Sequence, residues 1–364
     1  MAKTPQPSAY AASGVDIDAQ ERGLAKVKKL AKSTFTKGVL SEIGSFGGMF
    51  RPDLSGLAEP VLVASADGVG TKLAVAREMD DFSTVGRCLV NHCVNDILVQ
   101  GALPLFFLDY LGAGKLDPGK MAELVGGVAD GCKENGCALL GGETAEMPGF
   151  YQPGDYELAG FIVGLVDRAH VLDGSRVGPG DVLVGLPSSG LHTNGYSLAR
   201  RILFERLGLA PKAKAPWAKK RTVGQELLAV HRSYLKALSP LLRHPALHAL
   251  AHITGGGLTD NLPRVLPKGT RAEIRVGAWE IPEIFHFLEE QGEVPADEMF
   301  RVFNMGVGMV AVVEKEGLRD VLAALRKAGE KPFLIGSVQQ GGEGVVYNLG
   351  AQAAESGADS GTAI

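Results

Sequence analysis

Two short glycine-rich segments place acidic residues beside backbone that carries no side chains. The first reads SADGVGTK over residues 65–72, and the second reads GGETAEMPG over residues 141–149. Glycine allows tight turns and a close approach of ligand to backbone. Carboxylates suit Mg²⁺, which also takes phosphate oxygens and water as ligands. The two segments therefore predict a site that holds a polyphosphate through a divalent cation, as in an enzyme that uses ATP.

Three acidic residues are the candidate ligands of that cation. Asp67 follows one apolar run, Glu143 follows another, and Asp96 lies near the end of a predicted helix. The turn after Asp67 also contains Gly68, Gly70, Thr71 and Lys72. A single Gly-x-Gly segment is usually an ordinary turn with solvated charges, so the prediction depends on the three acids together. Leu73 stands where a dinucleotide-binding Gly-x-Gly-x-x-Gly motif needs glycine, and no Gly-x-x-x-x-Gly-Lys-Ser/Thr loop occurs.

Helical spacing adds polar residues around Asp96. Arg87, Asn91 and Asn95 follow one another at intervals of four, and His92 and Asp96 form the adjacent stripe. A polar helix face is usually solvated, but this one lies in an apolar stretch of sequence. A contact with a metal–phosphate group and a simple solvated face are both open explanations.

A second polar loop occurs in the C-terminal half, where SSGLHTNGYS spans residues 188–197. It precedes a predicted helix, and amides at a helix N-terminus bind anions. A histidine there can exchange a proton near neutral pH, although a lone loop histidine is more often structural. The segment AHITGGGLTDN over 251–261 is similar. The candidate substrate-binding residues are Ser188, Ser189, Gly190, His192, Asn194, His252 and Thr254.

The four cysteines do not predict a metal site. Cys88 and Cys93 have the same spacing as Cys132 and Cys137. Residues five apart on a helix point roughly 140° from each other, so the first pair cannot chelate one ion. Buried structural cysteines are expected instead.

Hydrophobic patterning predicts the elements that position these residues. In the first half we expect strands over 60–64, 104–111, 137–140 and 158–166, and helices over 15–33, 83–99 and 118–134. In the second half we expect strands over 181–187, 247–253, 271–276, 307–313 and 332–339, and helices over 196–207 and 224–242. Strands that alternate with helices indicate an α/β unit. The turn-rich stretch 167–180 predicts the boundary between two halves.

Composition limits the kind of protein. With 364 residues the chain exceeds what one core usually supports, so two domains are expected. A formal net charge of -4 gives no general attraction to nucleic acid or to an anionic membrane. No apolar run approaches the roughly 18 residues of a membrane helix, and the first residues lack the apolar core of a signal peptide. We therefore predict a cytoplasmic protein with a small-molecule substrate and no nucleic-acid or membrane partner.

In their order, these motifs resemble one family closely: the phosphoribosylformylglycinamidine cyclo-ligases, or aminoimidazole ribonucleotide synthetases, of purine biosynthesis. The resemblance covers residues 14–348 and includes SADGVGTK, CVNDILVQGALPLFFLDYLGAGKLD, GGETAEMPG, SSGLHTNGYSLAR, HITGGGLTDNLPRVLP and FNMGVGMV. A wider ATP-using superfamily, with formylglycinamidine synthase, selenophosphate synthetase and thiamine-phosphate kinase, shares an Asp-x4-Gly-Ala-x-Pro signature. Its members here are Asp96, Gly101, Ala102 and Pro104.

The resemblance implies a two-domain α/β (α+β) fold and a homodimer. Residues 1–170 would form the N-terminal ATP- and Mg-binding domain, with 1–13 mobile, and its sheet would pair with the dimer mate's into a barrel. Residues 171–349 would form a C-terminal α+β substrate-binding domain with a helix-backed mixed sheet. Residues 350–364 would be a disordered tail.

The resemblance also implies roles for individual residues. ATP would bind Lys28, Gly68, Gly70, Thr71, Lys72, Asn95, Gly141, Gly142 and Thr144. Mg²⁺ would bind Asp67, Asp96 and Glu143, and a monovalent cation such as K⁺ is a further candidate cofactor. The catalytic residues would be His192, Lys72, Asp67 and Asp96. Some superfamily relatives have an aspartate where this chain has His252, so no metal role is carried over to that position.

The implied reaction is ATP-dependent closure of an imidazole ring, through phosphorylation of the formyl oxygen to an iminophosphate. Two alternatives stay open. Another ATP-using member of the superfamily, such as a small-molecule kinase, would share the N-terminal motifs but not SSGLHTNGYS or GGETAEMP. A non-catalytic nucleotide-binding protein should have lost an acid or Lys72, and this sequence retains them.

Overall fold

The computed structural model describes residues 17–349, so the predicted mobile start and disordered tail lie outside the described residues. The described chain packs into two compact units. Unit 1 contains residues 17–97, 102–168 and 209–233, and unit 2 contains residues 98–101, 169–208 and 234–349. Residues 209–233 pack in unit 1, although sequence alone assigns them to the C-terminal half. Both units combine helices with a sheet, as expected for a two-domain α/β protein.

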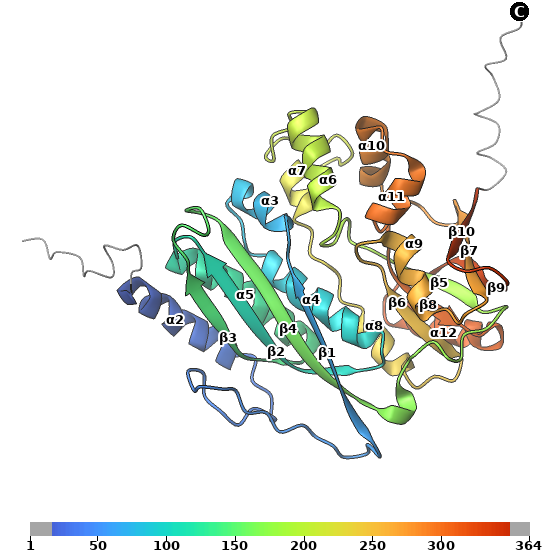
Figure 1. The fold of residues 1–364 in the computed structure, drawn as a ribbon, viewed down its shortest axis with the longest axis horizontal. Coiled ribbons are helices and arrows are strands. Elements are labelled where there is room, and N and C mark those ends of the chain that lie inside the picture. Colours follow the sequence, from blue (N-terminus) through green and yellow to red (C-terminus); the bar gives the residue numbers. More distant parts are fainter. Residues whose placement is uncertain (1–16, 350–364) are drawn as a thin grey trace, which may run out of the picture. The chain divides into compact units, whose positions relative to one another are not determined.

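Unit 1 is built on a four-stranded mixed sheet (Figure 1). Its strand order is β1 (Pro60–Gly68), β4 (Tyr156–Asp167), β2 (Leu103–Ala113) and β3 (Ala138–Glu146). β4 runs antiparallel to both of its neighbours, whereas β2 and β3 are parallel and are joined through helix α5 (Pro118–Asn135). The four predicted strands are confirmed, and each extends further than its apolar run.

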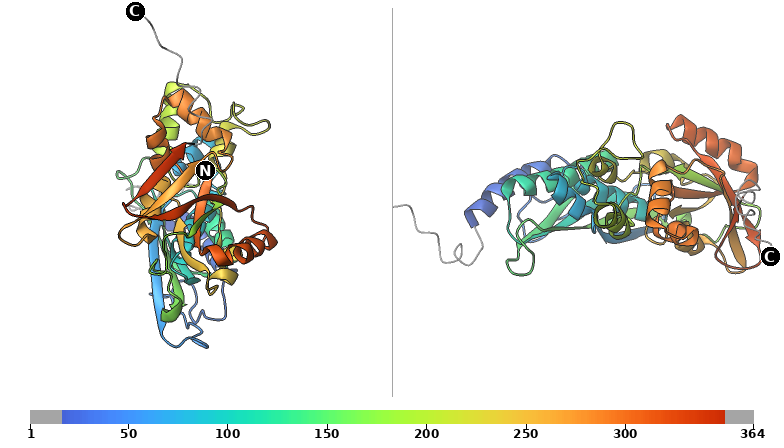
Figure 2. Two further views of the ribbon diagram at one scale, coloured as in Figure 1. Left: turned by 90° about the vertical axis from the view of Figure 1, so that its right-hand side faces the viewer. Right: turned by 90° about the horizontal axis from the view of Figure 1, so that it is seen from above.

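The remaining helices of unit 1 are α2 (Ile17–Lys32), α3 (Lys72–Met79), α4 (Val85–Leu98, whose last residue belongs to unit 2) and α7 (Val223–Leu227). α4 packs closely on β4 because Gly160 has no side chain: a Cβ there would lie 3.0 Å from Leu89 Cγ. α2 runs alongside α5 (Figure 2). The Asp117 side chain accepts hydrogen bonds from the backbone amides of Gly119 and Lys120. Asp117 is thus the N-cap residue of α5, which explains why the helix begins at Pro118.

Unit 2 has a six-stranded mixed sheet. Its order is β10 (Val345–Leu349), β7 (Thr270–Val276), β9 (Phe333–Gln340), β5 (Val182–Pro187), β8 (Val307–Val313) and β6 (Leu247–His252). β10 and β7 are parallel, and the other neighbours are antiparallel. Every residue of β8 is buried, so both faces of this strand are covered. The five predicted strands are confirmed, and β10 was not predicted.

The helices of unit 2 are α6 (Tyr196–Arg200, continued by a π-helical turn over Arg201–Arg206), α8 (Leu235–Leu238), α9 (Gly257–Asn261), α10 (Glu283–Gly292), α11 (Ala296–Val302) and α12 (Leu318–Lys327). Short 3₁₀ turns occupy Arg168–His170, Ser239–Leu241, Leu262–Val265 and Lys315–Gly317. Val321 and Leu325 of α12 join the buried side chains of Met309 and Val313 in one core.

The predicted helix over residues 224–242 is wrong. α7 ends at Leu227 and α8 begins at Leu235. Between them, backbone carbonyls of Ala229, His231 and Arg232 accept hydrogen bonds from side chains of unit 1 instead of from a continuing helix. In this segment, hydrogen bonds from side chains thus take the place of the backbone hydrogen bonds of a helix.

Candidate active site

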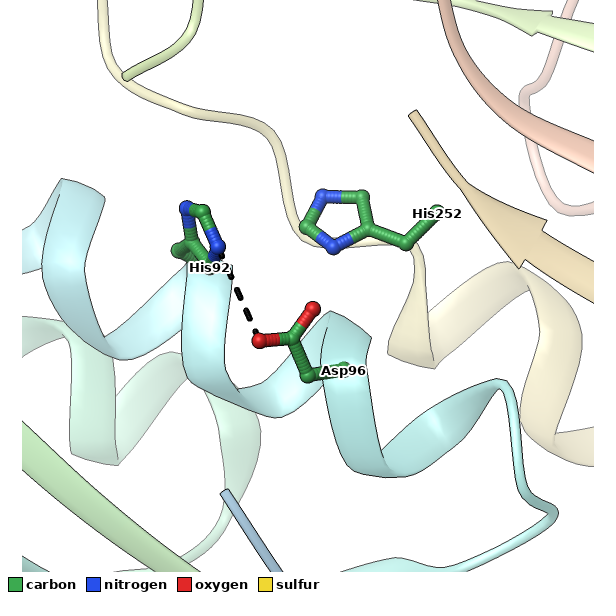
Figure 3. A group of neighbouring side chains, drawn as sticks. All are labelled: His92, Asp96 and His252. Atoms are coloured by element: carbon green, nitrogen blue, oxygen red, sulfur yellow. Dashed lines mark ion pairs between the residues drawn. The ribbon is translucent and has the colours of Figure 1, made fainter. Parts of the chain in front are cut away.

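The end of β1 and the middle of α4 bring Asp67, His92 and Asp96 together in unit 1. His92 Nε2 lies 2.5 Å from Asp67 Oδ2 and 3.6 Å from Asp96 Oδ2. Figure 3 shows how His92 and Asp96 project from successive turns of α4. The Ser65 hydroxyl donates to Asp96 Oδ2 at 3.1 Å, and the Gly68 amide donates to Asp67 Oδ1 at 2.6 Å. Hydrogen bonds from β1 thus fix the positions of both carboxylates, the one on β1 and the one on α4.

The charges in this group stabilise one another. Burial alone would raise the pKa of Asp67, but the hydrogen bond and charge of His92 and the Gly68 amide outweigh it, so the pKa is lowered. Burial would lower the pKa of His92, but the bond to Asp67 and the charge of Asp96 leave it raised. Asp67 and Asp96 are only partly buried, with 38% and 25% of their side-chain surface exposed. Two adjacent, accessible carboxylates suit a hard cation such as Mg²⁺.

Glu143 does not join these two carboxylates within one chain. Asp67 pairs with Gly160, Gly160 pairs with Asp109, and Asp109 pairs with Gly142. Asp67 and the residue preceding Glu143 are therefore three strand spacings apart, about 14 Å. Within a single chain the three predicted ligands therefore do not converge: Asp67 and Asp96 lie together, and Glu143 lies elsewhere on the sheet. Metal binding by these residues stays a prediction.

The predicted ATP-binding residues of unit 1 fall beside two different cavities. Gly70 and Thr71 line a cavity of about 310 Å³ together with Glu157. Gly141, Gly142, Glu143 and Thr144 line another, of about 180 Å³, next to α2. Lys28 is exposed on α2, and Gly68 is partly buried at the end of β1. Nucleotide binding by these residues stays a prediction.

Lys72 lies inside unit 1 and not on its surface. Its side chain is fully buried at the start of α3, and Nζ donates to Ala229 O at 2.7 Å. Burial lowers the pKa of this amine, against a smaller opposing effect of the neighbouring Cys88. The predicted role of Lys72 at the transferring phosphoryl group is untested, and the bond from Nζ to Ala229 O ties this side chain to the segment that follows α7.

The amide stripe on α4 holds the same segment. Asn91 Nδ2 donates to His231 O at 2.8 Å, and Asn95 Nδ2 donates to Arg232 O at 2.8 Å. Asn95 Nδ2 also lies 3.3 Å from His231 Nε2. Asn91 and Asn95 therefore form neither a solvated face nor, in this structure, an open ligand surface. Arg87 of the same stripe, in contrast, is partly exposed and pairs with Glu134. Sequence reasoning missed His231, because its neighbours suggested a helix.

In unit 2 the loop between β5 and α6 holds His192 in an uncommon conformation. Its φ is 61°, a left-handed value that costs energy outside glycine. Nε2 of the buried ring accepts a hydrogen bond from the Ser189 backbone amide at 3.1 Å, and the Tyr196 hydroxyl donates one to His192 O at 3.1 Å. Strain of this kind persists only where the surroundings enforce it, and it is common at functional sites.

The other predicted substrate residues surround this loop or follow β6. Ser188 Oγ donates to Asn304 Oδ1 at 3.0 Å, and Asn304 Nδ2 donates to Gly190 O at 2.8 Å. Asn194 Nδ2 is buried without a hydrogen-bond acceptor among the described residues, which is typical of a group reserved for a ligand. His252 is buried at the end of β6, and Thr254 Oγ1 donates to Asn261 Oδ1 at 3.3 Å. Sequence reasoning did not single out Asn304 as a site residue, because its segment FNMGVG contains no charged side chain.

Two expectations from sequence about the rest of the chain can be compared with the structure. All four cysteines are free and buried, as expected. In the part of the chain that the structure describes, no helix has the length and apolar character to span a bilayer.

Two family models match the chain. The model described as AIR synthase related protein, N-terminal domain, matches residues 55–166, and the corresponding C-terminal domain matches residues 178–348. Among curated proteins, the phosphoribosylformylglycinamidine cyclo-ligase of Trichlorobacter lovleyi is 52% identical over 91% of this chain and 94% of its own length. The one of Geobacillus sp. is 49% identical over 94% of this chain and 99% of its own.

Solved structures show the same fold at low sequence identity. Thiamine-monophosphate kinase from Stenotrophomonas maltophilia has a TM-score of 0.64 and 17% identity over 92% of this chain and 96% of its own. The hydrogenase maturation protein HypE in complex with ATP has a TM-score of 0.66 and 19% identity over 93% of both chains. The shared fold alone does not distinguish these enzymes, but the sequence identity of about 50% over nearly the full length does. The chain belongs to the phosphoribosylformylglycinamidine cyclo-ligases, ligases of purine biosynthesis.

Proposed function

We propose that this chain converts formylglycinamidine ribonucleotide and ATP into 5-aminoimidazole ribonucleotide, ADP and phosphate. The observation that carries the proposal is the 52% identity, over 91% of the chain, with a relative named for this cyclo-ligase. The family models support it, because their matches fall in both halves of the chain.

The chemistry explains why ATP is needed. An amide oxygen is a poor leaving group, so ring closure requires its activation. Transfer of the γ-phosphoryl group to the formyl oxygen gives an iminophosphate and ADP. A nearby amidine nitrogen then attacks the activated carbon, forms the C–N bond and expels the oxygen as phosphate. The protein's task in phosphoryl transfer is mostly positioning and electrostatic stabilisation.

Unit 1 supports the nucleotide half of this proposal. Asp67 and Asp96 converge at the end of β1 and on α4 and would hold Mg²⁺, which offsets charge on the phosphates when bound. The backbone of Gly141 to Thr144 lies beside a cavity and would contact ATP, with Lys28 on the neighbouring helix. A monovalent cation remains a further candidate cofactor.

Unit 2 supports the substrate half. The strained His192 loop and the buried Asn194 amide offer polar groups fixed by their surroundings, as substrate positioning requires. We assign His192 to proton handling or to contact with the developing oxyanion. His252 and Thr254 extend the predicted polar surface after β6.

A homodimer in the cytoplasm is part of the proposal. One face of the unit 1 sheet carries rows of apolar side chains: Leu62, Leu165 and Leu103 are partners across β1, β4 and β2. Leu62 is 64% exposed, Leu103 48% and Phe161 on the same face 45%. An apolar sheet face of this kind marks an interaction surface. A second copy that adds its own sheet would cover it and close the barrel expected for the family.

A coupled assay tests the reaction. Purified protein with formylglycinamidine ribonucleotide, ATP and Mg²⁺ should release ADP and form the aminoimidazole product in equal amounts. ADP release without the aminoimidazole would favour a small-molecule kinase, and absence of both would favour a non-catalytic nucleotide-binding protein. Either outcome contradicts the proposed ring closure.

A further inference from the structure

The cavity between α2 and the sheet of unit 1 contains a polar group that the preceding roles leave unused. This cavity, of about 180 Å³, is lined by apolar side chains, among them Leu24 and Val27 of α2 and Leu139 of β3. Residues Gly141 to Thr144 of β3 also line it. Asp109, on β2, is also part of the lining.

Asp109 lies on the helix-covered face of the sheet. Its neighbours on that face of β2, Phe107 and Leu111, are fully buried, and Asp109 itself is half-buried. Within the residues that the structure describes, the carboxyl group receives a hydrogen bond only from its own backbone amide and none from a side chain or another residue. Burial raises the pKa of Asp109 to about 7, and this backbone bond acts in the opposite direction with a smaller effect. A partly buried acid whose hydrogen bonds are incomplete costs stability unless a ligand completes them.

Gly142 gives this carboxyl group its room. It is the direct strand partner of Asp109. A Cβ at position 142 would overlap the Asp109 carboxyl oxygen and the backbone carbonyl of the same residue. Glycine here therefore has a steric reason that is separate from phosphate binding. Asp109 consequently lies directly beside the backbone that is expected to bind the nucleotide.

The cavity combines aliphatic side chains with the Asp109 carboxyl group as a hydrogen-bond acceptor, a combination that suits an aromatic ring with an N–H donor. Adenine presents an exocyclic amino group that donates to a carboxyl oxygen. Hypoxanthine and guanine present a carbonyl oxygen at the same ring position, which a carboxylate repels. The arrangement therefore distinguishes the 6-amino from the 6-oxo purines.

We propose that Asp109 selects the adenine base of ATP by accepting a hydrogen bond from its 6-amino group, with Leu24 and Val27 against the ring. This inference rests on the proposed use of ATP and adds to it the residue that determines base specificity. The base occupies the cavity beside α2, and the phosphates extend along the backbone of residues 141–144.

Binding of three nucleotides tests this assignment. At pH 8, above the pKa of Asp109, wild-type protein is titrated calorimetrically with ATP, with purine riboside triphosphate, which lacks the 6-amino group, and with inosine triphosphate, all with Mg²⁺. ATP should bind roughly 10- to 100-fold more tightly than the other two, as expected for a hydrogen bond to a charged group. Asp109→Ala should lower the affinity for ATP to that for purine riboside triphosphate and leave the latter unchanged.

A conservative variant covers the case in which Asp109→Ala does not fold. The side-chain amide of Asp109→Asn can accept from the 6-amino group or, turned over, donate to a 6-oxo group, so discrimination against inosine triphosphate should fall about tenfold or more. Asp130→Ala, which removes an exposed carboxylate on α5, serves as the control and should retain the wild-type preference.

The outcomes separate the two proposals. Wild-type protein that binds no nucleotide overturns the use of ATP itself. Wild-type protein that prefers ATP, together with Asp109 variants that weaken all three nucleotides equally, overturns the role of Asp109 in base selection. A uniform loss of that kind would mean that Asp109 only maintains the shape of the sheet.

Discussion

At the scale of single residues, the contact between Asp67 and His92 explains how a partly buried acid favours its ionised form. The raised pKa of His92 favours the protonated ring, whose charge faces both Asp67 and Asp96. The same two carboxylates remain accessible enough to meet a cation. A charge-neutralising change at Asp67 should therefore affect metal binding more than folding.

We expect Asp67→Asn to weaken Mg²⁺-dependent ATP binding by about tenfold or more, because it removes one of the carboxylates that hold the ion. Calorimetric titration of ATP with and without Mg²⁺ measures the effect. Asp53→Asn, which changes an exposed acid bonded to Ser55, is the control. An unchanged Mg²⁺-dependent affinity would reject Asp67 as a metal ligand.

Asp109 gives a prediction for stability as well as for binding. Its pKa is raised to about 7 in the folded protein from an ordinary value of 3.8. The stability that the protonated form contributes is therefore complete below about pH 4 and is lost as pH rises towards and through 7. Asp109→Asn should stabilise the protein relative to wild type more at pH 8 than at pH 5, by about 1–3 kcal/mol.

Urea unfolding of both proteins at the two pH values measures this difference. The other titratable groups near Asp109 are Cys132, whose thiol pKa is raised chiefly by burial, and Glu143 in the same cavity. The raised pKa keeps Cys132 neutral at both pH values, and Glu143 is the same in the two proteins. Equal pH dependence of wild type and Asp109→Asn would show that the acid is solvated in the folded state.

At the scale of elements, helix α4 links the carboxylate group to the segment that follows α7. From successive turns of the helix, Asn91 and Asn95 donate hydrogen bonds to backbone carbonyls of this segment. Lys72 on α3 donates another to the carbonyl of Ala229. A segment without helix or strand depends on such side-chain bonds to satisfy its backbone.

We expect Asn91→Ala to destabilise unit 1 by about 1–3 kcal/mol, because His231 O loses a buried donor. Hydrogen exchange should accelerate most in residues 228–234. The control is Lys133→Ala, an exposed residue of α5. Exchange that increases evenly over the whole of unit 1 would argue against a specific anchoring role.

This segment also shows where sequence was insufficient. Apolar runs of four to nine residues located the nine predicted strands, because buried strands must be continuously apolar or alternate. The run from Gly224 to Leu242 has the same helical periodicity as a true helix, but its carbonyls are taken by Asn91, Asn95 and Lys72, which lie far away in the sequence. The hydrophobic periodicity of a segment contains no information about hydrogen-bond partners that lie far away in the sequence.

The candidate site was predictable to a similar extent. Asp67 and Asp96 are flanked by glycine or helical polar residues, and the structure brings them together. The separation of Glu143 follows from strand order, which local sequence does not contain. Asp109 was not singled out because it stands alone in an apolar strand, and only its pairing with Gly142 reveals the cavity.

At the scale of the whole molecule, the open face of the unit 1 sheet is the feature that a single chain leaves unsatisfied. Its exposed apolar side chains occupy the same rows on three neighbouring strands. Burying such a face contributes about 25 cal/mol for each Å² removed from water, which favours association with a second copy. The proposed dimer would therefore be sensitive to charge at the centre of this face.

We expect Phe161→Glu to convert a homodimer into monomers, because a buried glutamate at the sheet face would lack a partner charge. Sedimentation equilibrium of wild type and variant measures the change as at least a tenfold increase in the dissociation constant. Leu54→Glu is the matched control, since Leu54 is also an exposed apolar residue, 47% exposed, but lies before β1 and outside the sheet. A Phe161→Glu protein that still dimerises as tightly as the control, or a wild-type protein that is monomeric, would remove the sheet face as the dimer interface.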